Sequence, residues 1–296
     1  MKTKNRRFAS ISEYILENFI KFCALFSSII IFAMIIFLIV NGLPTFGVVN
    51  PIDFLFGMTW NPSKNLYGIF PMIVGSFCVT ILALVFAVPL GVGCAIFLSE
   101  LAPKSIQKIL RPSIEVLVAI PSVVYGFVGM VLLVPFIRNT FNVNPGFSWL
   151  AASIILAIMI LPTITAISED AISSVPKELK EGSLALGSTR WQTIKKVMIP
   201  TALSGIISGI ILGMGRAIGE TMAVLMVAGN WALIPHSVFD PVRPLTSHIV
   251  LNIKEAVAGS TVYYAMFATG LVLFLIIIGL NMVSHYVNNK YRIKWD

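Results

Sequence analysis

Long apolar stretches separated by short polar segments dominate the hydropathy pattern of this chain. A helix needs about 20 apolar residues to cross the ~30 Å hydrocarbon core of a bilayer. The pattern predicts six spans, over residues 22–41, 69–99, 112–136, 149–167, 204–230 and 262–285. We therefore expect an all-α polytopic membrane protein with one transmembrane domain over residues 22–296.

The second and third spans are interrupted by helix-breaking residues. Pro89 lies inside the second span, and Pro121 lies inside the third, close to Gly126 and Gly129. Proline removes a backbone hydrogen bond, so both helices are expected to be kinked or broken. A broken helix at membrane depth typically lines a cavity, although a kink that only serves packing is the alternative explanation for the third span.

The N-terminal segment, residues 1–21, has a different pattern. Apolar residues such as Phe8, Ile11 and Ile15 recur at helical spacing, with polar residues such as Ser12 and Glu13 opposite them. This pattern predicts a cytoplasmic amphipathic helix lying along the membrane surface. The apolar run that follows is longer than a signal-peptide core and is read as an uncleaved first span.

Composition and charge support a membrane protein. Hydrophobic residues make up 57% of the chain and charged residues 11%, and the mean hydropathy is +0.91, which is too apolar for a soluble domain. The net charge of +8 does not indicate a nucleic-acid partner, because the basic residues flank the spans. Most Lys and Arg fall in loops on one side, so the positive-inside rule places both termini in the cytoplasm.

No cofactor or metal site is indicated. The cysteines and histidines are too scattered for a ligand cluster, and the cysteines lie in apolar runs. These residues are Cys23, Cys78, Cys94, His236, His248 and His285. A phosphate-cradling G-x-x-x-x-G-K sequence is also lacking, so any ATP chemistry is expected to belong to a partner.

The fifth span, 204–230, carries Arg216 and Glu220 near its middle. A charge at the centre of a bilayer costs about 2.5–3.5 kcal/mol on insertion scales, so both side chains should face protein or water. Arg216 offers a permanently charged, planar donor array for an oxyanion, and Glu220 can pair with it when the site is empty. Thr221 is a further candidate for the substrate path. The alternative is an ion pair that only orients helices.

Three glycines share the helix face that carries these charges. At 100° per residue, Gly205, Gly209 and Gly213 fall on one narrow stripe. Small residues at this spacing let two helices approach closely in a membrane. The glycines are therefore predicted to form a helix-packing seam.

The loop over residues 168–200 is predicted to be structured. Pro176 and Gly187 delimit a short helix with Leu179, Ser183 and Leu186 on one face, followed by a second helix capped by Ser188. A short exposed helix of this kind fits a groove on a partner protein. The alternative is a solvated surface loop.

The same loop resembles the EAA motif of bacterial ABC importer permeases, in which Glu-Ala-Ala, a Gly and a terminal Ile-x-Leu-Pro stand at fixed spacing. The matching positions are Glu181, Gly182, Ser183, Gly187, Val197, Ile199 and Pro200. Gly and Ser replace the two alanines, and Val and Ile replace the apolar pair before the final proline. The resemblance implies that this loop docks into an ATPase subunit and transmits its closure.

Further segments resemble the PstC-type permeases of phosphate importers. They are FLFGMTW from Phe54, YGIFPMIVGS from Tyr67, VPLGVGCAIFLSELAP from Val88, AIPSVVYGF from Ala119 and GRAIGETMAVLMVAGN from Gly215. The resemblance implies a type I importer permease fold in the bacterial cytoplasmic (inner) membrane, without a catalytic site of its own. The implied partners are a PstA-like permease subunit, two copies of an ATPase subunit, an extracytoplasmic phosphate-binding protein, inorganic phosphate and membrane lipids.

Three other functions stay open at this point. The substrate could be another oxyanion, such as sulfate or molybdate, because the binding protein normally selects it. A secondary transporter or channel working without an ATPase is a second alternative, against which the EAA-spaced loop argues. A membrane sensor is the third, although the sequence contains no soluble signalling domain.

Overall fold

The computed structural model describes residues 2–291, with the side chains of Tyr14 and residues 16–287. This part of the chain consists of helices and connecting loops, apart from one short antiparallel hairpin in which Trp60 pairs with Tyr67. The elements before the third predicted span are α1 (Lys2–Gly42), η1 (Leu43–Gly47), α2 (Pro51–Phe56), β1 (Trp60–Asn61), η2 (Pro62–Lys64), β2 (Leu66–Tyr67), α3 (Phe70–Ile96) and η3 (Phe97–Leu101). Those that follow are α4 (Lys104–Ala119), α5 (Ser122–Val128), η4 (Gly129–Leu133), α6 (Val134–Phe141), α7 (Trp149–Ser173), α8 (Lys177–Ala185), α9 (Arg190–Thr193), η5 (Ile194–Met198), α10 (Ile199–Gly219), α11 (Met222–Val227), α12 (Leu245–Ile253) and α13 (Thr261–Tyr291).

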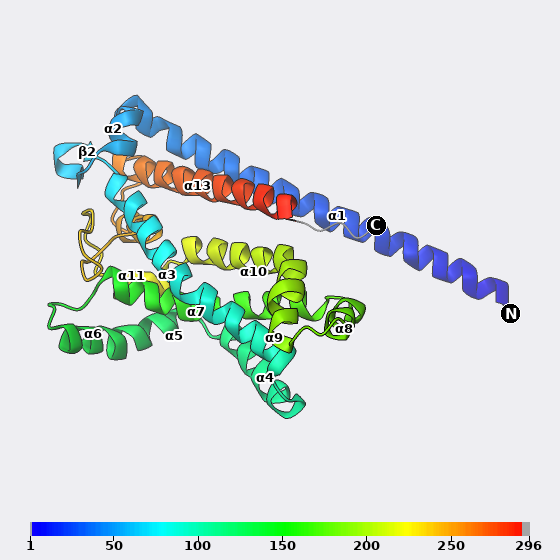
Figure 1. Cartoon of the computed structure of the whole chain (residues 1–296). Helices are drawn as coiled ribbons and strands as arrows, with labels where there is room; N and C mark the ends of the chain where they lie inside the picture. Colours follow the sequence, from blue (N-terminus) through cyan, green and yellow to red (C-terminus); the bar gives the residue numbers. More distant parts are fainter. Residues whose placement is uncertain (1, 292–296) are drawn as a thin grey trace.

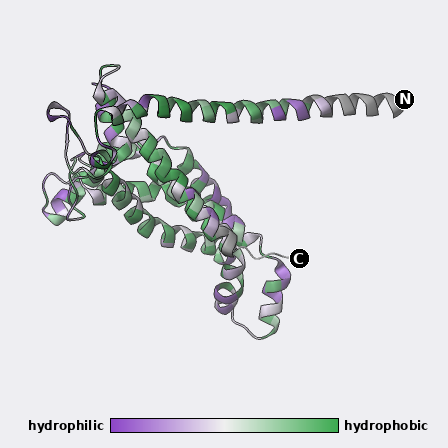
Figure 2. Ribbon diagram, turned by 90° about the horizontal axis from the view of Figure 1, so that it is seen from above, coloured by the Kyte–Doolittle hydropathy of each residue, from purple (hydrophilic) through white to green (hydrophobic). Residues whose placement is uncertain are grey.

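Six helical segments within the described residues are long and apolar enough to cross a membrane, as the sequence predicts. They cover Leu16–Gly47, Phe70–Leu101, Ser122–Phe141, Trp149–Ser173, Arg190–Gly219 and Thr261–Val287. Figure 2 shows apolar residues along the bundled helices and hydrophilic residues mainly towards the ends of the bundle. The all-α polytopic fold is confirmed.

The first helix is continuous. Backbone hydrogen bonds run from Lys2 to Gly42, so no break separates the predicted surface helix, residues 1–21, from the first span. The side chains of Phe8, Ile11 and Ile15 lie outside the described ones, and the surface position of this segment stays a prediction.

Helix α7 forms the centre of the bundle. It packs against α3 on one side and α10 on the other, whereas α1 lies against α13 at the periphery (Figure 1). Small residues such as Ala151 and Ala152 are fully buried in α7 and let its neighbours approach closely. The hydroxyl of Ser153 also donates to the Val79 carbonyl of α3 at 3.2 Å. This central packing positions the residues of the candidate site.

The second and third predicted spans behave differently at their prolines. Of the predicted kink or break at Pro89, the break is not formed: α3 continues through Pro89, because a single lost hydrogen bond is tolerated in a 27-residue helix packed along α7. The chain does break at Pro121, where Ile120 has extended dihedrals (φ −64°, ψ 128°), as expected for a residue before proline. The third span consequently begins at Ser122 rather than residue 112, and Glu115 lies in the separate amphipathic helix α4.

The connection between the first two spans is folded rather than irregular. In α2, the Asn50 side chain accepts a hydrogen bond from the Ile52 amide, and Phe54 is fully buried. Trp60 packs edge-on against the ring of His248 in α12, with ring centroids 4.3 Å apart. Figure 1 places α2 and β2 at the end of the molecule opposite α8 and α9.

Burial of His248 predicts a pH-dependent stability. Its ring is fully buried, and burial, with a smaller effect from Arg243, lowers the His248 pKa from 6.5 to about 3. The unfolded chain therefore takes up a proton below about pH 6.5 that the folded chain excludes, and stability falls by up to about 1.4 kcal/mol per pH unit on acidification. Thermal unfolding in detergent between pH 7 and pH 5 measures this slope.

The variant His248→Gln should reduce the slope, because glutamine does not titrate. Exposed His236 offers a control, since His236→Gln removes a histidine without disturbing the buried cluster. An unchanged slope in His248→Gln would contradict the assignment.

Candidate functional site

The charged segment of the fifth span is a break between two helices. Helix α10 ends at Gly219, and α11 begins at Met222. The Glu220 carboxylate accepts a hydrogen bond from the Ala223 amide at 3.1 Å, and the Glu220 carbonyl accepts one from the Thr246 hydroxyl at 3.0 Å. The prediction of one continuous span over 204–230 is therefore wrong. Two contacts hold this break, because Glu220 caps the first turn of α11 and Thr246 of α12 holds the Glu220 carbonyl.

Arg216 lies one turn before this break. It is half-buried, and its Nη1 donates to the Thr163 hydroxyl of α7 over a long distance of 3.5 Å. Among the described residues it forms no ion pair, so the predicted pairing with Glu220 is not formed. The physical reason is that Glu220 has left the helix and its carboxylate caps α11. Thr221 is also half-buried, and its hydroxyl donates to the Gly219 carbonyl.

The three glycines of α10 lie against α7. A methyl group at Gly205 would stand 2.3 Å from the Cβ of Ala171, and one at Gly213 would stand 2.8 Å from the Ile164 side chain. At Gly209 the nearest atom would be the Ile167 Cβ, at 3.2 Å. The stripe thus brings the α10 and α7 backbones together, and the same face carries Arg216 to Thr163.

The loop before α10 contains the two short helices expected from its sequence. Helix α8 starts after Pro176, and Gly187 follows it with a positive φ of 83°. The second helix, α9, is capped by Thr189 rather than Ser188, because Thr189 and Gln192 form a reciprocal capping box.

The side chains of α8 divide into an inner and an outer set. Leu179 packs on the cluster that includes Ile194 and Met198, and the Ser183 hydroxyl lies 3.0 Å from that of Thr193. Leu186, the residue directly after α8, is in contrast 90% exposed, so the prediction that Leu179, Ser183 and Leu186 share one face is wrong.

The remaining positions of the EAA-like pattern follow the same division. Glu181, Gly182, Gly187 and Pro200 are exposed, whereas Val197 and Ile199 are half-buried. The exposed members therefore lie mainly on α8 and at its end.

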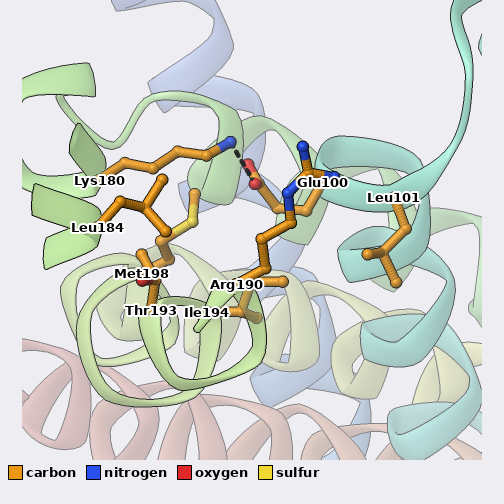
Figure 3. A pocket seen from close by; sticks show the side chains of 8 residues that line it. All are labelled: Glu100, Leu101, Lys180, Leu184, Arg190, Thr193, Ile194 and Met198. Carbon is orange, nitrogen blue, oxygen red and sulfur yellow. Dashed lines mark hydrogen bonds and ion pairs between the residues drawn. The ribbon is translucent and has the colours of Figure 1, made fainter. Parts of the chain in front are cut away.

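A pocket of about 140 Å³ opens between α8, α9 and the end of α3 (Figure 3). Inside it, Lys180 of α8 forms an ion pair with Glu100 of η3, with Nζ and Oε2 2.5 Å apart. A second ion pair joins Arg111 of α4 to Glu169 of α7, also at 2.5 Å. The first pair joins residues 80 positions apart and leaves no local sequence pattern, so sequence reasoning missed it.

Comparisons with known proteins identify the family of this chain. Residues 87–293 match the family described as binding-protein-dependent transport system inner membrane component. The probable ABC transporter permease protein YqgH of Bacillus subtilis is 46% identical over 92% of this chain and 89% of its own length. The phosphate transport system permease protein PstC of Pasteurella multocida is 37% identical over 92% of this chain and 90% of its own.

Solved structures share the fold. A chain of a bacterial alginate ABC transporter aligns over 93% of this chain and 97% of its own length, with a TM-score of 0.62 at 16% identity. A chain of the MetNI methionine ABC transporter aligns over 76% of this chain and 95% of its own, with a TM-score of 0.57 at 18% identity. The chain belongs to the binding-protein-dependent inner-membrane components, the permease family of ABC importers.

Proposed function

We propose that this chain is the permease subunit of an ATP-driven phosphate importer. The observation that carries the phosphate assignment is the similarity to relatives named PstC over 92% of the chain. In this proposal a PstA-like subunit completes the translocation path, and two ATPase copies power it. An extracytoplasmic binding protein delivers inorganic phosphate, and both termini lie in the cytoplasm of a bacterial cell.

The substrate path is proposed to pass the break between α10 and α11, at Arg216, Glu220 and Thr221. Three features support this position. Arg216 is half-buried and has no carboxylate partner among the described residues, so its charge is available to an anion. The Thr163 hydroxyl lies beside it as a second polar group. A guanidinium can hold two phosphate oxygens in a planar, bidentate geometry.

The coupling to ATP hydrolysis is proposed to run through α8. Its outer surface presents Glu181, Gly182 and Leu186 to a partner, while Leu179 holds the helix against the bundle. Helix α10 follows through Ile199 and Pro200, so movement of the loop reaches the glycine seam and Arg216 along one chain segment.

Reconstitution tests the proposal. The chain is co-expressed with its partner permease and ATPase, placed in proteoliposomes, and supplied with the binding protein, ATP and labelled phosphate. We expect ATP-dependent phosphate uptake that a tenfold excess of sulfate or molybdate leaves largely unchanged.

The outcomes separate the alternatives. Strong inhibition by sulfate or molybdate would assign another oxyanion, which the name of the YqgH relative does not exclude because it specifies no substrate. Uptake that persists with an inactivated ATPase would instead indicate a secondary transporter.

A further inference from the structure

We propose that the ion pair between Lys180 and Glu100 links the coupling helix α8 to the membrane-spanning helix α3 and is required to convert ATP hydrolysis into transport. The inference rests on the proposed function, because it assigns two positioning residues to the coupling step. In this proposal a movement of α8 is transmitted to two spans. It reaches α10 through the connecting chain and α3 through this ion pair.

The geometry of the pair suits a mechanical link. The Glu100 side chain is 8% exposed and that of Lys180 41%, and the charged atoms lie 2.5 Å apart. A carboxylate withdrawn from water requires a counter-charge, so separating the two groups is strongly disfavoured. Lys180 is therefore expected to stay with Glu100 when α8 moves.

The Glu100 end of the link is rigid. Glu100 lies in η3, a wide helical turn that continues α3 without a gap. The Gln107 amide closes this turn, since its Nε2 donates to the carbonyls of Leu98 and Ala102 at 3.0 Å each. A displacement of Glu100 consequently moves the end of α3 rather than a loose loop.

The Lys180 end is equally well held. Leu179, its neighbour in α8, packs on the cluster around Ile194, and Ser183 lies 3.0 Å from Thr193 through their hydroxyl oxygens. Lys180 is thus fixed to a helix whose opposite surface is free for a partner.

The pocket that contains this pair also holds a second cation. Arg190 lines the same pocket from α9, but within the described residues only Lys180 reaches Glu100 as an ion-pair partner (Figure 3). The open volume of about 140 Å³ gives the two side chains room to shift together.

The test uses the reconstituted complex and measures phosphate transported per ATP hydrolysed. In Lys180→Met and Glu100→Gln we expect this ratio to fall at least tenfold while the assembled complex still hydrolyses ATP. Lys180→Arg keeps the positive charge and should retain most of the ratio. Lys108→Met is the control, because Lys108 is an exposed lysine in α4, outside the coupling helix, and forms no ion pair among the described residues.

If a single variant fails to assemble, the double variant provides the test. The double variant Glu100→Gln with Lys180→Met leaves no unpaired buried charge, so it is expected to assemble and still couple poorly. An assembled double variant with the wild-type ratio would overturn the inference. A failure of the double variant to assemble would also overturn it, because the pair would then serve folding, and so would an equal defect in Lys108→Met. A wild-type complex without phosphate uptake would instead refute the proposed function.

Discussion

Phosphate uptake by an assembled complex carrying Arg216→Ala is expected to fall about a hundredfold or more. Hydrogen bonds to charged groups contribute roughly 1.5–3 kcal/mol each, and a bidentate contact to phosphate loses two of them. Arg216 has no carboxylate partner among the described residues. Its removal therefore leaves no buried carboxylate without a counter-charge and should leave the fold intact. The measurement is ATP-dependent uptake in proteoliposomes at equal amounts of assembled complex.

Two further variants make the Arg216 prediction specific. Arg216→Lys keeps the charge but not the planar donor array, so an intermediate loss is expected. Arg138→Ala removes an exposed arginine at the end of α6 and should leave uptake near the wild-type level. Full uptake by assembled Arg216→Ala would exclude Arg216 from the substrate path.

Adding one methyl group at Gly205 should destabilise the bundle by up to about 2 kcal/mol. Overpacking a close contact typically costs about 1–3 kcal/mol, and the change from glycine to alanine returns about 1 kcal/mol of helix propensity. The new Cβ would stand 2.3 Å from that of Ala171, so α10 and α7 must separate. Thermal unfolding of the detergent-solubilised chain with Gly205→Ala measures the loss.

The same two helices provide the controls. Gly215→Ala lies on α10 with nothing within 4 Å of the added atom, so it should be neutral or stabilising. Combining Gly205→Ala with Ala171→Gly removes the overlap, and most of the stability lost in the Gly205 variant should return. If the combined variant were no more stable than Gly205→Ala, the contact between Gly205 and Ala171 would not be the cause.

The spans and the short helix α8 could be read from the sequence because their signals are local. An apolar run must be buried in lipid or protein wherever it lies, and Pro176 and Gly187 restrict the backbone at their own positions. The spacing of Gly205, Gly209 and Gly213 likewise specified a face, although not the helix that it contacts.

The break after Gly219 shows what local signals do not decide. The apolar pattern runs on from α10 into α11, yet Glu220 caps a new helix and Thr246 holds its carbonyl. Hydropathy alone cannot distinguish a carboxylate that pairs with Arg216 from one that caps Ala223, because both satisfy a buried charge. The Arg216 environment therefore depended on contacts with α7 and α12.

By itself, the sequence determined the membrane-spanning architecture, the glycine face and the position of the loop over residues 168–200, because hydrophobicity and backbone restriction act within a few residues. Only the tertiary structure decided which helices meet. It brought Ala171 to Gly205, Thr163 to Arg216 and Glu100 to Lys180. These pairs lie far apart in sequence, and packing around α7 in three dimensions selects them from many chemically equivalent alternatives.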